Sequence, residues 1–350
     1  MIFASPAGGL RQPHNQAHRV LACCTIIVGH CEEILGIDSS LPGRIFQLTL
    51  NVWGQYAVPL FFVLAGYSLA PKLSRPGSQK NAVKYTRRIL AMFLSASAFY
   101  FLLNAASGAR PGQSIGLAVS QEAERVQRAP EVFILGTAPH LWFLVALILA
   151  VWTTTYVRSQ TRLRYLFGVG AICYILLMAT GPYSMLTGWH SLPTVWRMTL
   201  FTGTPFLAVG LALRHASTLP PTPIAFLMIA AGLLCQVAEQ YWRWTEWGLT
   251  PFRVGPLLGT GLHAVGMSLL AVRPGTSWFS QQVARLGPLT LFTYLIHMAF
   301  VAILVPRMSM LSRPTARWLF PVMVAILSFG CAAIYYWSMM MVRRNYRRLK

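Results

Sequence analysis

The first long apolar stretch of the chain contains the ionisable residues Arg19, His30 and Glu33. On an α-helix, eleven positions at about 100° each bring Arg19 and His30 within roughly 20° of one face, about 16 Å apart along the axis. Glu33 follows His30 by about one turn, where its carboxylate could accept a hydrogen bond from the ring, fix its tautomer and favour its protonated form. The pattern predicts a general base, His30, supported by Glu33 and aligned with Arg19. The alternative is a structural histidine in a polar seam.

A second group of residues that could do chemistry is the basic cluster of Lys84, Arg87 and Arg88. Their helical spacing would let them bind the phosphates of a cofactor together. Positive residues beside a membrane span are also expected from the rule that cytoplasmic loops are basic, so the cluster has a purely topological explanation as well.

Two further histidines lie deep within apolar stretches. His297 and His263 could share a polar cavity with His30. His263 stands among Gly259, Gly261 and Gly266, where close helix packing is expected, and this favours a structural role.

The sequence lacks the motifs of several common enzyme classes. It contains no GxSxG elbow, P-loop, HExxH pair or dinucleotide-binding glycine motif in a strand and helix context. Its six cysteines lie in apolar stretches without metal-site spacing, so we interpret them as buried apolar residues and predict no metal. Any catalysis must therefore take place within the helices themselves.

The elements that must position these residues are membrane helices. The chain of 350 residues is 55% hydrophobic, has only 11% charged residues, and has a mean hydropathy of +0.53. Several apolar runs reach about 20 residues, the length that crosses a bilayer as a helix. We predict an all-α, polytopic membrane bundle in one domain, 1–350, with a basic tail at 343–350. Its ten spans are expected near 19–37, 52–71, 88–107, 139–157, 165–181, 195–213, 222–241, 254–272, 286–305 and 318–342.

The distribution of the basic residues behind the net charge of +21 indicates how the chain is oriented in the membrane. With the N-terminus inside, nineteen of the 29 Lys and Arg residues fall on the cytoplasmic side, and the other side receives ten together with all eight acidic residues. Both termini are therefore predicted to be cytoplasmic, in a multi-pass protein of the cell membrane. A nucleic-acid partner is not expected, because no soluble basic domain is present to hold a duplex.

Six segments, in order, resemble the membrane acyltransferase family 3. They are RVLACCTIIVGH, which runs from Arg19 to His30, then QYAVPLFFVLAGYSL, KYTRRIL, HLWFLVAL, TPFLAVGLALR and LGPLTLFTYLIHMAF. The resemblance extends from about Arg19 to about Phe300 and includes the ten spans.

The resemblance implies transfer of an acyl group, acetyl in our prediction, from acyl-CoA to a hydroxyl of a glycan, lipid-linked sugar or small molecule. It also implies that the first-span Arg19 and His30 are essential and that the basic residues from Lys84 to Arg88 bind the donor. Two departures stand out. Ala65-Gly66 replaces the usual Ser-Gly, and Leu90 and Ala91 replace the basic residue that commonly follows the third-span arginines.

Two other functions compete with this prediction. A transporter or proton-coupled carrier could use His30, Glu33 and His297 as a relay near mid-membrane, although the repeated broken helices typical of such carriers are not visible. A sensory or interaction protein could keep the same helices without catalysis.

Overall fold

The computed structural model describes residues 13–35, 41–73, 77–108, 113–129, 131–160, 163–189, 192–249, 255–275, 277–308 and 313–348. Within these ranges the regular structure is helical, which confirms the predicted all-α class. The chain divides into two compact units, Met1–Phe61 with Leu219–Lys350, and Phe62–Thr218. The helix α3 (Ala57–Leu73) crosses from the first unit to the second.

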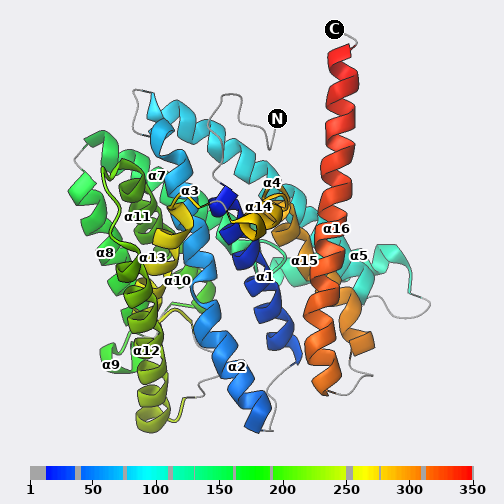
Figure 1. Ribbon diagram of the computed structural model, residues 1–350. Helices are drawn as coiled ribbons and strands as arrows, with labels where there is room; N and C mark the ends of the chain where they lie inside the picture. The colour runs from blue at the N-terminus through cyan, green and yellow to red at the C-terminus, as the bar shows by residue number, and fades with distance from the viewer. Residues whose placement is uncertain are drawn as a thin grey trace. The chain divides into compact units, whose positions relative to one another are not determined.

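The first unit is built around its N-terminal helix (Figure 1). Its elements are α1 (Pro13–Leu35), α2 (Leu41–Gly54), α12 (Thr222–Trp247), α13 (Leu258–Val272), α14 (Trp278–Ala284), the 3-10 helix η1 (Gly287–Leu289), α15 (Thr290–Met308) and α16 (Arg313–Arg348). The helix α1 contacts α2, α13, α14, α15, η1 and α16. Its buried apolar side chains are small or aliphatic, among them Ala22, Cys23, Ile27 and Cys31. Neighbouring helices can therefore approach α1 closely on several sides.

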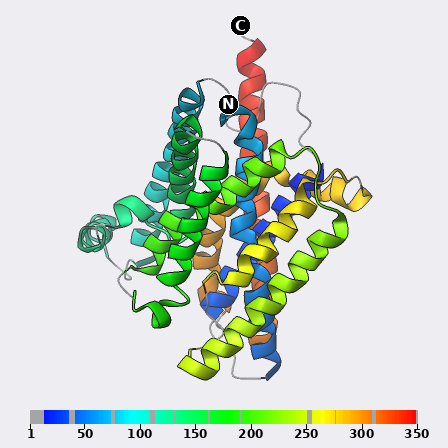
Figure 2. The same ribbon diagram turned by 90° about the vertical axis from the view of Figure 1, so that its left-hand side faces the viewer.

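The helices α12 and α13 form a tight pair, which Figure 2 shows side by side in yellow-green and yellow. A Cβ atom added to Gly232 would collide with the backbone of His263, and one added to Gly259 or Gly266 would meet the backbone of α12. Glycine is therefore required where the two backbones touch. The prediction of close packing around Gly259 and Gly266 is confirmed. The helix α12 ends at Gly248, whose φ of 64° lies in the left-handed region.

The second unit contains the remaining helices. They are α4 (Ser78–Gly108), α5 (Ile115–Arg128), α6 (Val132–Leu135), α7 (Trp142–Gln160), α8 (Leu163–Ala179), α9 (Ser184–Thr187), α10 (Thr194–Phe201) and α11 (Gly203–His215). A Cβ atom on Gly66 of α3 would collide with the carbonyl of Leu207 in α11, and one on Gly210 of α11 with the carbonyl of Val63 in α3. These two glycines let the helices cross in backbone contact.

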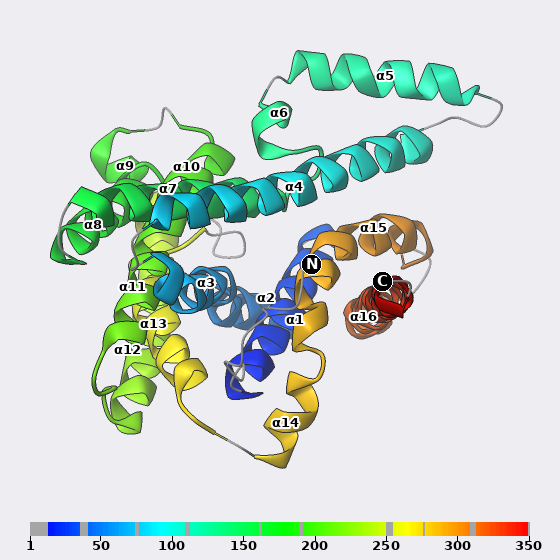
Figure 3. The same cartoon turned by 90° about the horizontal axis from the view of Figure 1, so that it is seen from above.

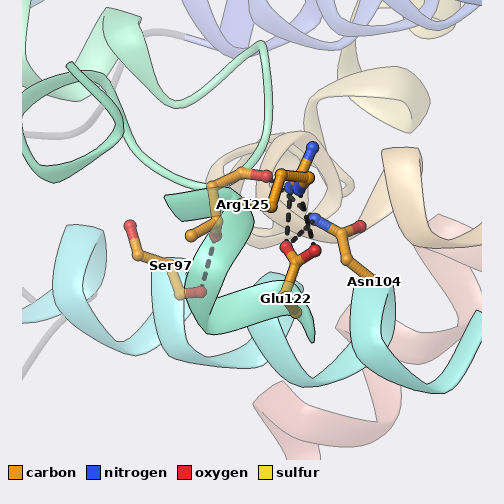
Figure 4. A network of polar contacts seen from close by, with 5 residues as sticks. Ser97, Asn104, Glu122 and Arg125 are labelled. Carbon is orange, nitrogen blue, oxygen red and sulfur yellow. Dashed lines mark hydrogen bonds and ion pairs between the residues drawn. The ribbon is translucent and has the colours of Figure 1, made fainter. Parts of the chain in front are cut away.

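An amphipathic helix that hydropathy did not predict, α5, lies alongside α4 (Figure 3). Glu122 of α5 is buried, and its carboxylate accepts hydrogen bonds from Arg125 at 2.6 and 2.8 Å and from Asn104 of α4 at 3.3 Å. Asn104 also donates to the carbonyl of Thr137, whose hydroxyl donates to the carbonyl of Ser97 at 2.6 Å. This network, drawn in Figure 4, fixes α5 and the following segment onto α4.

Each of the ten predicted spans overlaps at least one described helix. Five helical segments are long and apolar enough to cross a membrane: Gly43–Leu73, Ser78–Gly108, Thr222–Trp247, Trp278–Arg307 and Trp318–Val342. Three shorter helices are also apolar: Trp142–Val157, Leu163–Ala179 and Leu258–Val272. The protein therefore has several membrane-spanning helices, and the number ten stays a prediction.

Candidate active site

Arg19 and His30 lie on one unbroken helix, because α1 runs from Pro13 to Leu35. Both side chains are half-buried and both have polar or electrostatic partners. With continuous helical geometry between them, the two residues share a face and are separated by about 16 Å along the axis. One residue before Arg19, outside the predicted span, burial lowers the pKa of the His18 imidazole.

A second imidazole lies beside His30 within the first unit. The ring centroids of His30 and His297 of α15 are 5.3 Å apart, and the ring planes are inclined by 31°. His297 has no exposed surface, and its Nδ1 lies 2.6 Å from the carbonyl oxygen of Tyr294. The structure thus brings together His30 and His297, for which the sequence had suggested a shared polar cavity.

The supporting carboxylate predicted for His30 cannot be placed. Glu33 belongs to α1, but its side chain lies outside the described residues. Glu32, which the spacing argument did not select, is buried with 6% exposure and has an interaction partner. The role of Glu33 therefore stays a prediction.

The basic cluster of Lys84, Arg87 and Arg88 belongs to the second unit, on the N-terminal part of α4. Lys84 and Arg87 are exposed, whereas Arg88 is half-buried and has a partner. The indole Nε1 of Trp152 in α7 donates to the hydroxyl of Thr86 at 2.9 Å, which ties this turn of α4 to its neighbour. The cluster is thus carried by a helix, with the cations of Lys84 and Arg87 exposed.

His263 occupies a different environment. It is fully buried in the α12 and α13 pair, with its Nδ1 3.4 Å from the amide nitrogen of Gln236. The rings of Trp53 and Tyr56 lie 5.3 and 5.1 Å from its own. These contacts agree with the structural role that the surrounding glycines predicted. Gln236 and Thr260 complete this seam, and sequence reasoning missed them because a lone polar residue in a span carries no spacing signal.

Comparison with known families gives one match over most of the chain. A family model described as an acyltransferase domain matches residues 17–337. The matched range contains His30, His297 and the basic cluster of α4. Searches of curated proteins and of solved structures found no match.

Proposed function

Because the chain belongs to the membrane acyltransferase family 3, we propose that it transfers an acetyl group from acetyl-CoA to a hydroxyl of a glycan or related acceptor. The observation that carries the proposal is His30, a half-buried imidazole on the same face of α1 as Arg19. A base held in a partly dehydrated site can take a proton from a hydroxyl that is too weak an acid to react unaided.

The chemical step is a direct acyl transfer. The acceptor hydroxyl loses its proton to His30 as its oxygen attacks the thioester carbonyl carbon. The carbon–sulfur bond then breaks, the coenzyme leaves as a thiolate, and the imidazolium returns the proton to that sulfur. The products are an ester and free CoA, and His30 regains its starting state.

The donor is held by its phosphates. Lys84, Arg87 and Arg88 on α4 supply three cations, and a guanidinium can bind a phosphate with two parallel hydrogen bonds. Arg19 binds the donor from α1 on the face that carries His30. The protein lies in the cell membrane, where the acceptor is a glycan, a lipid-linked sugar or a small hydroxylated molecule.

The proposal is tested with His30→Ala and Arg19→Ala in the full chain, in membranes where insertion is verified. Loss of the base should reduce acetyl transfer by at least about 10²-fold. Loss of Arg19 should raise the acetyl-CoA concentration needed for half-maximal rate by about tenfold, the equivalent of about 1.4 kcal/mol. Transfer is measured from radiolabelled acetyl-CoA, and mass spectrometry of cellular glycans should show a missing acetyl increment.

His215→Gln is the matched control, because His215 ends α11 and binds the carbonyl of Leu211 at 2.7 Å. Full transfer activity in a correctly inserted His30→Ala protein would refute the proposal.

A further inference from the structure

The helices α1 and α15 stay in register over at least two turns. The thiol of Cys23 contacts the carbonyl oxygen of Thr290 at 3.7 Å, and the ring of His30 lies beside that of His297. His30 follows Cys23 by seven residues on α1, and His297 follows Thr290 by seven residues on α15. Seven residues are about two helical turns. The two helices therefore run side by side in the same direction, with the Cys23 contact two turns before the histidine pair.

The contact with Tyr294 determines where His297 carries its proton. A carbonyl oxygen only accepts hydrogen bonds, so the Nδ1 atom at 2.6 Å from it must be the donor. In the neutral ring the remaining nitrogen, Nε2, is then an acceptor. The His297 ring is thus fixed in both orientation and tautomer, and its acceptor atom belongs to a ring whose centroid is 5.3 Å from that of His30.

Few ionisable groups surround this pair in the described part of the first unit. The elements packed on α15 are α1, η1 and α16. From α1 come His30 and the buried thiol of Cys23, and the buried Cys31 and Glu32 follow His30 on the same helix. Tyr294 lies on α15 itself, with its ring 5.7 Å from that of His297. Between Trp318 and Val342, α16 contains no Asp, Glu, Lys, Arg or His, and its Tyr335 stacks on Phe292 at 4.4 Å.

We propose that His297 is a positioning residue for His30 and that the two rings form an imidazole pair. Within the described part of the chain the buried Nε2 atom of His297 makes no hydrogen bond; in the proposed pair it accepts one from the neighbouring His30 ring, which keeps the His30 proton on that side. The other nitrogen of His30 then receives the proton of the acceptor hydroxyl. When His30 becomes an imidazolium, the same hydrogen bond stabilises its charge until the proton passes to the CoA sulfur. The net protonation of His297 does not change.

This inference rests on the proposed acyl transfer, and two near-isosteric variants test it. In His297→Gln the amide oxygen can replace Nε2 as an acceptor toward His30. In His297→Asn the shorter amide can still donate to Tyr294 but does not reach His30. We expect His297→Asn to lower kcat by about 10²-fold, with the KM for acetyl-CoA within about twofold of the wild type. The kcat of His297→Gln should be at least about tenfold higher than that of His297→Asn.

His263→Gln is the control for altering a buried imidazole, since His263 is as buried as His297 and pairs with Gln236 instead. Its kcat should change less than about threefold. The assay uses membrane vesicles carrying the full chain, radiolabelled acetyl-CoA as the probe, and release of the CoA thiol together with acetyl incorporation as readouts. Equal kcat values for the Asn and Gln variants would overturn the proposal, because only the acceptor atom distinguishes them.

A second measurement does not depend on turnover. Nitrogen-15 spectra of the histidine rings report which nitrogen carries the proton, and His30 is assigned with the His30→Gln variant. We expect a single His30 tautomer in the wild type and in His297→Gln, and a mixture in His297→Asn. An unchanged His30 tautomer in all variants would overturn the pairing. A change in tautomer without acetyl transfer by the wild type would leave the pair intact but reject the proposed function, and with it the catalytic role of His297.

Discussion

Burying an ionisable side chain inside an apolar helix costs free energy. The histidines of the first unit differ in their burial and in the contacts that offset this cost. His263 packs between two aromatic rings and beside Gln236. His297 is buried and bonded to the carbonyl of Tyr294. His30 is half-buried, so part of its ring stays accessible to a substrate. This contrast in burial, more than residue type, supports His30 as the base of the proposed reaction.

The basic residues of α4 should govern donor binding without affecting chemistry. Replacing Lys84, Arg87 or Arg88 with Gln should raise the KM for acetyl-CoA by about 3- to 30-fold each, because each change removes a charged hydrogen bond of about 1–2 kcal/mol. The value of kcat should change less than about threefold, since these cations bind ground state and transition state equally.

Arg164→Gln is the matched control for that series, because Arg164 is exposed in the same unit and lies over its neighbour Tyr165. If the KM for acetyl-CoA rises as much in this control as in the α4 variants, general loss of positive charge would explain the effect and the cluster would not be a donor site.

The candidate site was only partly predictable from spacing. Arg19 and His30 share a helix, so their relation follows from helical geometry alone. The neighbour of His30 could not be deduced in the same way, because His297 is 267 positions away and only helix packing decides which faces meet. Glu33 was chosen because it is near in sequence, and its role stays a prediction; the ring contact with His297 comes from α15.

At the scale of helices, the crossing of α3 and α11 depends on two glycines. Gly66→Ala should destabilise the protein by about 1–3 kcal/mol, because the added methyl group would collide with the carbonyl of Leu207 and force the backbones apart. The change is measured as a lower midpoint of thermal unfolding in detergent. Gly210→Ala should behave alike, since its methyl group would collide with the carbonyl of Val63.

Gly168→Ala in α8 is the control for Gly66→Ala, because nothing lies within 4 Å of an added Cβ there. This variant should be neutral or more stable by up to about 1 kcal/mol, as expected for alanine in a helix. Equal destabilisation by Gly66→Ala and Gly168→Ala would show that the α3 and α11 contact is looser than described.

Hydropathy predicted the apolar part of each helix but not its full length. The helix α4 begins at Ser78, ten residues before the predicted span, because its first turns are polar and still form helix. The segment before the second predicted span is also helical, since α2 begins at Leu41 and buries Gln47. Hydropathy did not predict the helix α5, because its charged residues resemble those of a loop. The hydrogen bond of buried Glu122 with α4 stabilises it. In each case tertiary contacts compensate polar residues that a hydropathy scan counts against a helix.

For the molecule as a whole, charge distribution should set the orientation in the membrane. The helix α16 is continuous from Arg313 to Arg348, so the apolar part Trp318–Val342 and the arginines after it form one rod. Four arginines follow that apolar part before the end of the helix: Arg343, Arg344, Arg347 and Arg348. Moving such a group across the bilayer is strongly unfavourable, and basic segments flanking a span remain in the cytoplasm.

We therefore expect a reporter fused after Lys350 to be active in the cytoplasm. A fluorescent protein that folds only inside the cell should be bright at this position, and alkaline phosphatase, which is active only outside, should be inactive. The same pair inserted after Ala129, which follows α5 in the predicted external loop, should give the opposite result. Neutralising the four arginines should weaken this preference, because the inside rule depends on their charge. Phosphatase activity at Lys350 would contradict the predicted orientation, and with it the side from which acetyl-CoA reaches Arg19.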